Sequence, residues 1–159
     1  MAEIAEDAEK RNSVDASTIG AGRLKMDQTE HESQLVKAFI RREKHDRMLG
    51  FLAHPKKRQK ATDALYHLRD LNEKCTVQIK PNYQYPDQIS QLLREKGAPK
   101  TCWVVSTNPD LDAKELDLDF VLSEIIGRSH GTLLSCIPGV LGYFEGETPN
   151  DRFILQRPK

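Results

Sequence analysis

Apolar side chains in the first half of the chain recur at helical spacing. They are Leu35, Phe39, Met48, Leu49 and Leu52 over residues 30–52, then Ala61, Ala64, Leu65, Leu68 and Leu71 over residues 55–71. Steps of three and four residues place such positions on one face of a helix. Pro55 suits the first turn of the second segment, where its missing N–H costs nothing. The pattern predicts a helical hairpin over residues 29–72.

After residue 72 the pattern changes to short strands that alternate with helices. The predicted strands cover 75–79, 101–106, 132–137, 140–145 and 152–156, and the predicted helices cover 86–95 and the segment from Asp117 or Asp119 to Gly127. Strand–helix–strand units predict parallel strands joined by crossovers, and the two short final connections predict an antiparallel meander. We therefore expect an α/β fold with a mixed three-layer sheet in the order α-α-β-α-β-α-β-β-β.

Residues 1–28 differ from the rest because they hold few large apolar side chains and no sustained period. Ordering such a segment costs more conformational entropy than its burial returns. We expect a disordered tail over 1–28 and one α/β domain over 29–159. Within that domain, residues 29–72 form the hairpin and residues 73–159 the sheet body.

Charge is distributed unevenly, although the chain carries 24 basic and 24 acidic residues. Residues 41–60 hold eight basic and two acidic side chains. Such a segment suits a polyanion, because each neutralised phosphate releases counterions. The candidate polyanion-binding residues are Arg41, Arg42, Arg47, Lys56, Lys57, Arg58 and Lys60. A solvated helix face, with Glu43 and Asp46 offsetting part of the charge, explains the same pattern, and both interpretations stay open.

A second group of polar residues follows the predicted strand 101–106. In an open parallel sheet, ligands lie beyond the carboxyl ends of the strands. The candidate ligand-binding residues there are Ser106, Asn108, Asp110 and Asp112, with Lys80 after the first strand. These side chains can hold Mg²⁺ or a polar ligand, with Lys80 near an anionic group. Asx turns leading into a helix cap explain the same residues without any ligand.

The cysteines and histidines give no catalytic or metal pattern. Cys75, Cys102 and Cys136 lie in apolar runs without a CxxC motif, and His130 lies at the opposite end of a predicted strand from Cys136, about 20 Å away. The remaining histidines lack the spacing that presents two rings together on a helix. We expect buried, reduced thiols, no metal site and no cofactor.

These observations favour a non-catalytic binding protein. Its hairpin would contact the backbone of RNA or DNA, or an acidic protein surface. The alternative is a small enzyme or a ligand or nucleotide sensor that uses the loops at Lys80 and Ser106. No apolar run approaches the roughly 20 residues that span a membrane, and the N-terminus is acidic, so we expect a soluble cytoplasmic protein without a membrane partner. A homo-oligomer that pairs through strand 152–156 stays open.

Overall fold

The computed structural model describes residues 29–64, 70–80, 82, 85–128, 130–148 and 150–158. The chain divides into two compact units, Met1–Glu30 and His31–Lys159, and the sheet belongs to the second. The predicted disordered tail, residues 1–28, lies outside the described residues.

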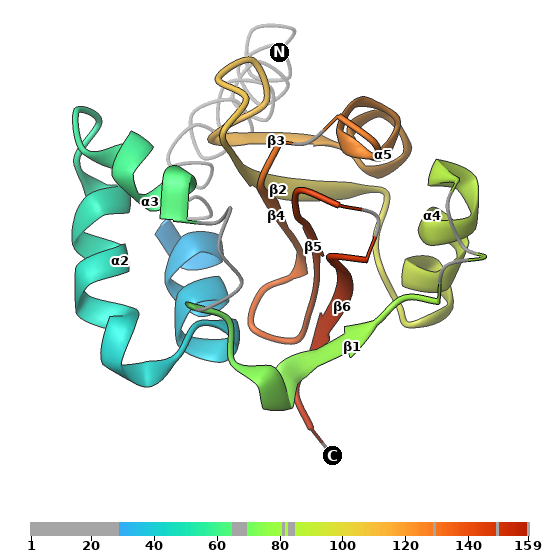
Figure 1. Cartoon of the computed structure of the whole chain (residues 1–159), viewed down its shortest axis with the longest axis horizontal. Helices are drawn as coiled ribbons and strands as arrows, with labels where there is room; N and C mark the ends of the chain where they lie inside the picture. Colours follow the sequence, from blue (N-terminus) through green and yellow to red (C-terminus); the bar gives the residue numbers. More distant parts are fainter. Residues whose placement is uncertain are drawn as a thin grey trace, which may run out of the picture. The chain divides into compact units, whose positions relative to one another are not determined.

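The second unit contains both helices and strands, so the predicted mixed α/β content is confirmed. Residues 29–39 are helical. The elements that follow are η1 (Arg42–Lys44), α2 (His45–Ala53), α3 (Arg58–Ala64), η3 (Glu73–Cys75), β1 (Thr76–Gln78), α4 (Pro86–Glu95), β2 (Thr101–Ser106), β3 (Lys114–Asp117), α5 (Leu118–Ile125), β4 (Thr132–Ile137), β5 (Leu141–Glu145) and β6 (Arg152–Gln156) (Figure 1). Among the described helices, none has the length and apolar character needed to cross a membrane.

The single helix predicted over residues 30–52 is interrupted. Ile40 forms an isolated antiparallel bridge with Leu71, and the backbone N–H of Arg41 donates to the carbonyl of Asp70 at 2.8 Å. The N–H of Asn72 in turn donates to the carbonyl of Phe39 at 2.8 Å. Pairing with a segment about 30 residues away thus outweighs the local helical preference, and α2 starts as a separate helix.

The six strands form one sheet in the order β1-β6-β5-β4-β2-β3, and every neighbouring pair is antiparallel. The prediction of parallel strands is therefore wrong. Two arrangements explain the error. Strand β3 lies in a segment predicted as a loop and turns back on β2, and the final meander lies between β1 and β2. As a result β1 and β2 run in the same direction but are not neighbours.

The predicted C-terminal meander agrees with the observed pairing of β4 with β5 and of β5 with β6. Strand β6 is not an edge, however, because it pairs with β1 on its other side. The prediction that strand 152–156 offers a free edge for self-association is therefore wrong. The edge strands are β1 and β3.

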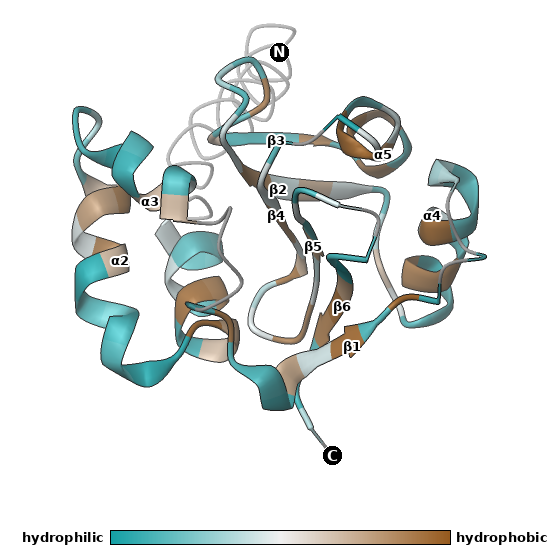
Figure 2. Ribbon diagram, in the orientation of Figure 1, coloured by the Kyte–Doolittle hydropathy of each residue, from teal (hydrophilic) through white to brown (hydrophobic). Residues whose placement is uncertain are grey.

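Side chains alternate between the two faces of the sheet, and each face carries a hydrophobic cluster. On one face, Trp103, Val105, Leu133 and Phe144 pack with residues of the helix 29–39, α2 and α3. On the other, Val104, Leu134, Tyr143 and Ile154 pack with residues of α4 and α5. Figure 2 shows the apolar residues of α4 on the side of the helix that faces the sheet. The hairpin and the α4–α5 pair thus contact different faces.

A pair of glycine substitutions tests the close packing of the central strands. A Cβ on Gly142 would lie 2.5 Å from the backbone oxygen of Leu134, whereas a Cβ on Gly50 would meet nothing within 4 Å. We expect Gly142→Ala to destabilise the protein by about 1–3 kcal/mol, because backbone must move to make room. Gly50→Ala, in α2, should stabilise it by up to about 1 kcal/mol. Urea unfolding of both variants measures the difference, and equal stabilities would contradict the packing.

Candidate functional site

Most of the predicted polyanion-binding residues lie exposed on the hairpin formed by α2 and α3. Six basic side chains of η1, α2, α3 and the turn between the two α-helices form no ion pair with any described residue. They are Arg42, Lys44, Arg47, Lys56, Lys57 and Lys60. These six residues are called the hairpin cations below. Lys44 is half-buried and the other five are exposed.

A hollow of about 520 Å³ lies between α2 and α3. The guanidinium carbon of Arg47 lies 5.4 Å from the centre of the Phe51 ring, and the Lys60 ammonium lies 5.8 Å from it. Cation–π attraction to one ring therefore holds two cations from different helices near each other. Asp63 and Asp70 also line the hollow and reduce its net charge. Arg47 and Lys60 line the same hollow, and cations of this kind suit a phosphate or a carboxylate.

Phe51 and Lys44 were not among the predicted site residues. Phe51 is half-buried and lines the hollow together with Lys44. The four-residue step from Arg47 to Phe51 is the signal that points to their contact, because such residues are neighbours on a helix.

Arg58 has a different role from its neighbours. Its Nη1 and Nη2 donate to Glu32 at 3.0 and 2.5 Å, and its Nε and Nη2 donate to Asp112 at 2.6 and 3.1 Å. Only 11% of its side chain is exposed. Burial alone would lower the pKa of the guanidinium, but the hydrogen bonds and charges of the two carboxylates raise it overall. Arg58 is therefore a structural ion-pair residue and does not belong to the exposed basic surface.

Arg41 also bonds to neighbouring residues, but it is more exposed than Arg58. Its Nε donates to the carbonyl of Leu71 at 3.2 Å, and its Nη2 lies 3.5 Å from Glu73. The side chain keeps 40% of its surface exposed. Such an exposed pair contributes little to stability, and Arg41 stays accessible at the margin of the hairpin.

The polar loop after β2 is closed by its own hydrogen bonds. Asp112 accepts from the backbone N–H of Ser106 at 3.0 Å, in addition to Arg58. Ser106 Oγ accepts from the N–H of Asn108 at 3.0 Å, and Asn108 Oδ1 accepts from the N–H of Asp110 at 2.9 Å. These are the Asx-type turns that explain the residues without a ligand. No group of three or more metal-ligating side chains occurs among the described residues.

Lys80 does not join this loop. Lys80 follows β1, and Ser106 ends β2. Because these two strands run in the same direction, both residues lie at the same end of the strands. Three strands separate β1 from β2, which corresponds to about 19 Å at the usual spacing of about 4.8 Å between strands. The expectation that neighbouring parallel strands bring Lys80 and the Ser106 loop together is therefore wrong, because β6, β5 and β4 lie between β1 and β2.

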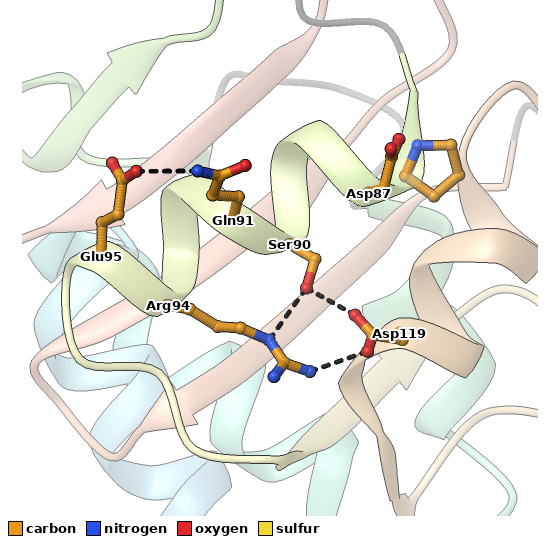
Figure 3. Close-up of a pocket in the computed structure, with 7 residues that line it drawn as sticks. Asp87, Ser90, Gln91, Arg94, Glu95 and Asp119 are labelled. Carbon is orange, nitrogen blue, oxygen red and sulfur yellow. Dashed lines mark hydrogen bonds and ion pairs between the residues drawn. The ribbon is translucent and has the colours of Figure 1, made fainter.

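A second hollow, of about 620 Å³, lies along α4 beside Asp119 of α5 (Figure 3). Ser90 Oγ donates to Asp119 at 2.5 Å and accepts from Arg94 Nε at 3.1 Å, while Arg94 Nη2 pairs with Asp119 at 2.8 Å. The four-residue step from Ser90 to Arg94 is the only sequence signal for this contact. Each polar group of this triad is bonded to the other two, so the triad joins α4 to α5.

A buried ionic group at the end of β5 was not predicted either. Glu145 and Arg152 face each other in register, and Arg152 Nε donates to the two Glu145 oxygens at 3.0 and 3.1 Å. Tyr143 Oη and the backbone N–H of Gly127 also donate to this carboxylate. Burial raises the pKa of Glu145 above its usual value, although all these partners oppose the shift. The group fixes the end of α5 to the β5–β6 hairpin.

The prediction of buried, free thiols is confirmed for Cys75, Cys102 and Cys136. Burial raises the pKa of Cys136 to about 12 and that of Cys102 still further above its usual value. Because the thiolate is the nucleophile, such thiols are inert at neutral pH. No described feature supports cysteine catalysis.

Comparisons of the chain with protein-family models, with curated proteins and with solved structures gave no match. The candidate site is therefore chosen on geometry and charge. The hairpin cations are not paired with described carboxylates, whereas Arg58, Arg94 and Arg152 are.

Replacing Arg58 tests its structural role. Arg58→Ala leaves Glu32 and Asp112 without their shared cation, and we expect it to lower the free energy of unfolding by about 3–5 kcal/mol. Lys57→Ala, at the exposed neighbouring position, should change it by less than about 0.5 kcal/mol. The triple variant Glu32→Gln, Arg58→Met, Asp112→Asn should regain part of the loss, because no charge then stays buried alone. Urea unfolding measures all three, and equal losses for Arg58→Ala and Lys57→Ala would contradict this role.

Thiol labelling tests the burial of the cysteines. We expect no reaction of the folded protein with a disulfide reagent such as DTNB at about pH 8, because the thiols are covered and their pKa values are raised. In urea all three should react at once. Rapid labelling of one thiol in the folded protein would show an exposed or activated cysteine.

Proposed function

We propose that this protein binds the sugar-phosphate backbone of RNA or DNA through the hairpin cations. The observation that carries the proposal is the convergence of Arg47 and Lys60, from two different helices, on the ring of Phe51. Lys56 and Lys57 extend the positive surface along the turn between α2 and α3. Phosphates release condensed counterions when such side chains neutralise them, and this supplies sequence-independent affinity.

Contact with the backbone is favoured over contact with bases. Phe51 is half-buried and already carries two cations over its ring, so the ring is poorly placed to stack on a base. The other candidates for stacking, Tyr66 and His67, lie outside the described residues. Phosphate contacts position a protein on nucleic acid without reading its sequence.

An acidic protein surface would use the same cations, and the test below separates it from nucleic acid. Nucleic acid is favoured because the hairpin cations extend over η1, α2, α3 and the turn between the α-helices. A nucleic acid presents a continuous row of phosphates that such an extended surface can contact. The alternative of a small enzyme or nucleotide sensor is less favoured, since the side-chain oxygens of Ser106, Asn108 and Asp112 already accept hydrogen bonds from the loop backbone. Lys80 also follows a strand that three others separate from β2. A cytoplasmic location and a homo-oligomer stay predictions.

The salt dependence of binding tests the proposal. We expect the full chain to bind a fluorescein-labelled, single-stranded RNA of about 20 nucleotides, with an affinity that falls steeply between about 50 and 200 mM salt. Lys56→Glu/Lys57→Glu should weaken binding at least tenfold and reduce the slope of log K against log salt by about 1.4, since two phosphate contacts are lost. Fluorescence anisotropy measures both quantities.

The matched control is Lys37→Glu/Lys100→Glu, which makes the same change of charge at exposed positions outside η1, α2, α3 and the turn between the α-helices. This control should change RNA affinity by less than about twofold. An equal effect of the two double variants would show that net charge alone matters and would overturn the assignment to the hairpin. Binding of an acidic polypeptide such as polyglutamate, without binding of RNA or DNA, would favour an acidic protein partner instead.

A further inference from the structure

A groove of about 360 Å³ extends from the edge strand β1 to the neighbouring ends of β6 and β5. Its lining includes Val77 of β1 and Val140, which precedes β5. These two valines keep 46% and 53% of their surface exposed, and they are two of the four large hydrophobic residues that are exposed in the described part of the chain. Exposed apolar side chains in a groove that reaches an edge strand form a surface that a partner can cover.

The backbone of β1 has hydrogen-bonding groups available at this edge. The N–H of Ile79 donates to the carbonyl of Arg152 at 2.9 Å. Since bonded residues alternate along an antiparallel pair, Val77 bonds to β6, and the backbone groups of Thr76 and Gln78 point away from it. The Thr76 N–H donates to the carbonyl of Glu73, within η3. The N–H and carbonyl of Gln78 have no partner among the described residues and can pair with an added strand.

The charges around the groove have one sign. Lys74, Lys96 and Arg157 line it, and its described lining contains no carboxylate. All three side chains are exposed, and none forms an ion pair with a described residue. The groove therefore combines a small apolar floor with a cationic margin. A complementary ligand carries an apolar side chain flanked by acidic ones.

The opposite edge of the sheet differs in both respects. Strand β3 exposes Lys114 and Glu115, and charged side chains on an edge discourage pairing with another chain. Strand β1 reads Thr-Val-Gln, which is uncharged and contains two β-branched residues. Of the two edges, β1 is therefore the one suited to accept a further strand.

We propose that β1 and its cationic groove bind an extended acidic segment of a partner protein, which adds to the sheet beside β1. Main-chain hydrogen bonds to Gln78 supply part of the affinity. An apolar side chain of the segment packs against Val77. Acidic side chains two positions to either side lie on the same face of the added strand and reach Lys96 and Arg157. This partner is separate from the nucleic acid proposed for the hairpin cations.

The probe is a blocked, labelled peptide, Glu-Thr-Val-Thr-Glu, in which the two acids and the valine share one face when extended. Its matched control is Lys-Thr-Val-Thr-Lys. We expect the full chain to bind the acidic peptide and not the basic one. The charge reversal Lys96→Glu/Arg157→Glu should weaken binding of the acidic peptide at least tenfold and create binding of the basic one. Fluorescence anisotropy at low salt gives the affinities.

Two further measurements separate strand addition from simple charge attraction. Gln78→Pro removes the outward N–H and should weaken peptide binding severalfold, whereas Lys37→Glu/Lys100→Glu should leave it unchanged. Circular dichroism and a thermal melt check that each variant is folded. In the unsubstituted protein, hydrogen exchange of the Gln78 amide should slow when the acidic peptide is added, and this readout needs no variant.

The proposal is overturned if the acidic peptide does not bind, if charge reversal fails to exchange the preference, or if exchange at Gln78 stays unchanged on binding. It is also overturned if Lys96→Glu/Arg157→Glu weakens RNA binding while neither peptide binds, because the groove would then belong to a nucleic-acid surface. Failure of RNA binding at the hairpin leaves these outcomes unaffected, so the two proposals are tested separately.

Discussion

The hydrogen-bonded ion pairs of Arg58 determine where the hairpin lies on the sheet. Arg58 begins α3, Glu32 belongs to the first described helix, and Asp112 lies in the turn between β2 and β3. The indole N–H of Trp103, in β2, donates to the same Glu32 at 2.8 Å. Buried charges are tolerated only when partners satisfy them, so these groups permit one arrangement of three segments that are far apart in sequence. The hairpin cations are thus carried on a fixed element.

The structure separates the roles of its basic residues. The five ion pairs between described residues all use arginine, and those of Arg58 and Arg152 are largely buried. Arginine suits these positions because its planar guanidinium holds several oxygens at once. Lysines predominate on the two proposed binding surfaces, where a flexible, hydrated charge can meet a ligand. A chain with no net charge still presents positive surfaces, because its charges are unevenly distributed, with eight basic and only two acidic side chains over residues 41–60.

The antiparallel sheet gives the two proposed surfaces different chemistry. The hairpin contacts one face of the sheet and presents side-chain charge alone, which suits a phosphate backbone. The groove beside β1 adds free main-chain groups and an apolar floor to its charge, which suits an extended polypeptide. The difference arises because β1 is an edge strand, whereas β6, which the sequence left open as an edge, is paired on both sides.

The sequence by itself determined the local elements of this protein. The local pattern of apolar, polar and capping residues predicts helix 86–95, the Asp117 cap that accepts from the Phe120 N–H, and strands 101–106, 132–137 and 152–156. Only the tertiary structure decided the direction and order of the strands and the different role of Arg58. Those outcomes depend on partners 26, 54 and more residues away in the sequence. A local pattern of apolar and charged positions does not specify which distant residues pair.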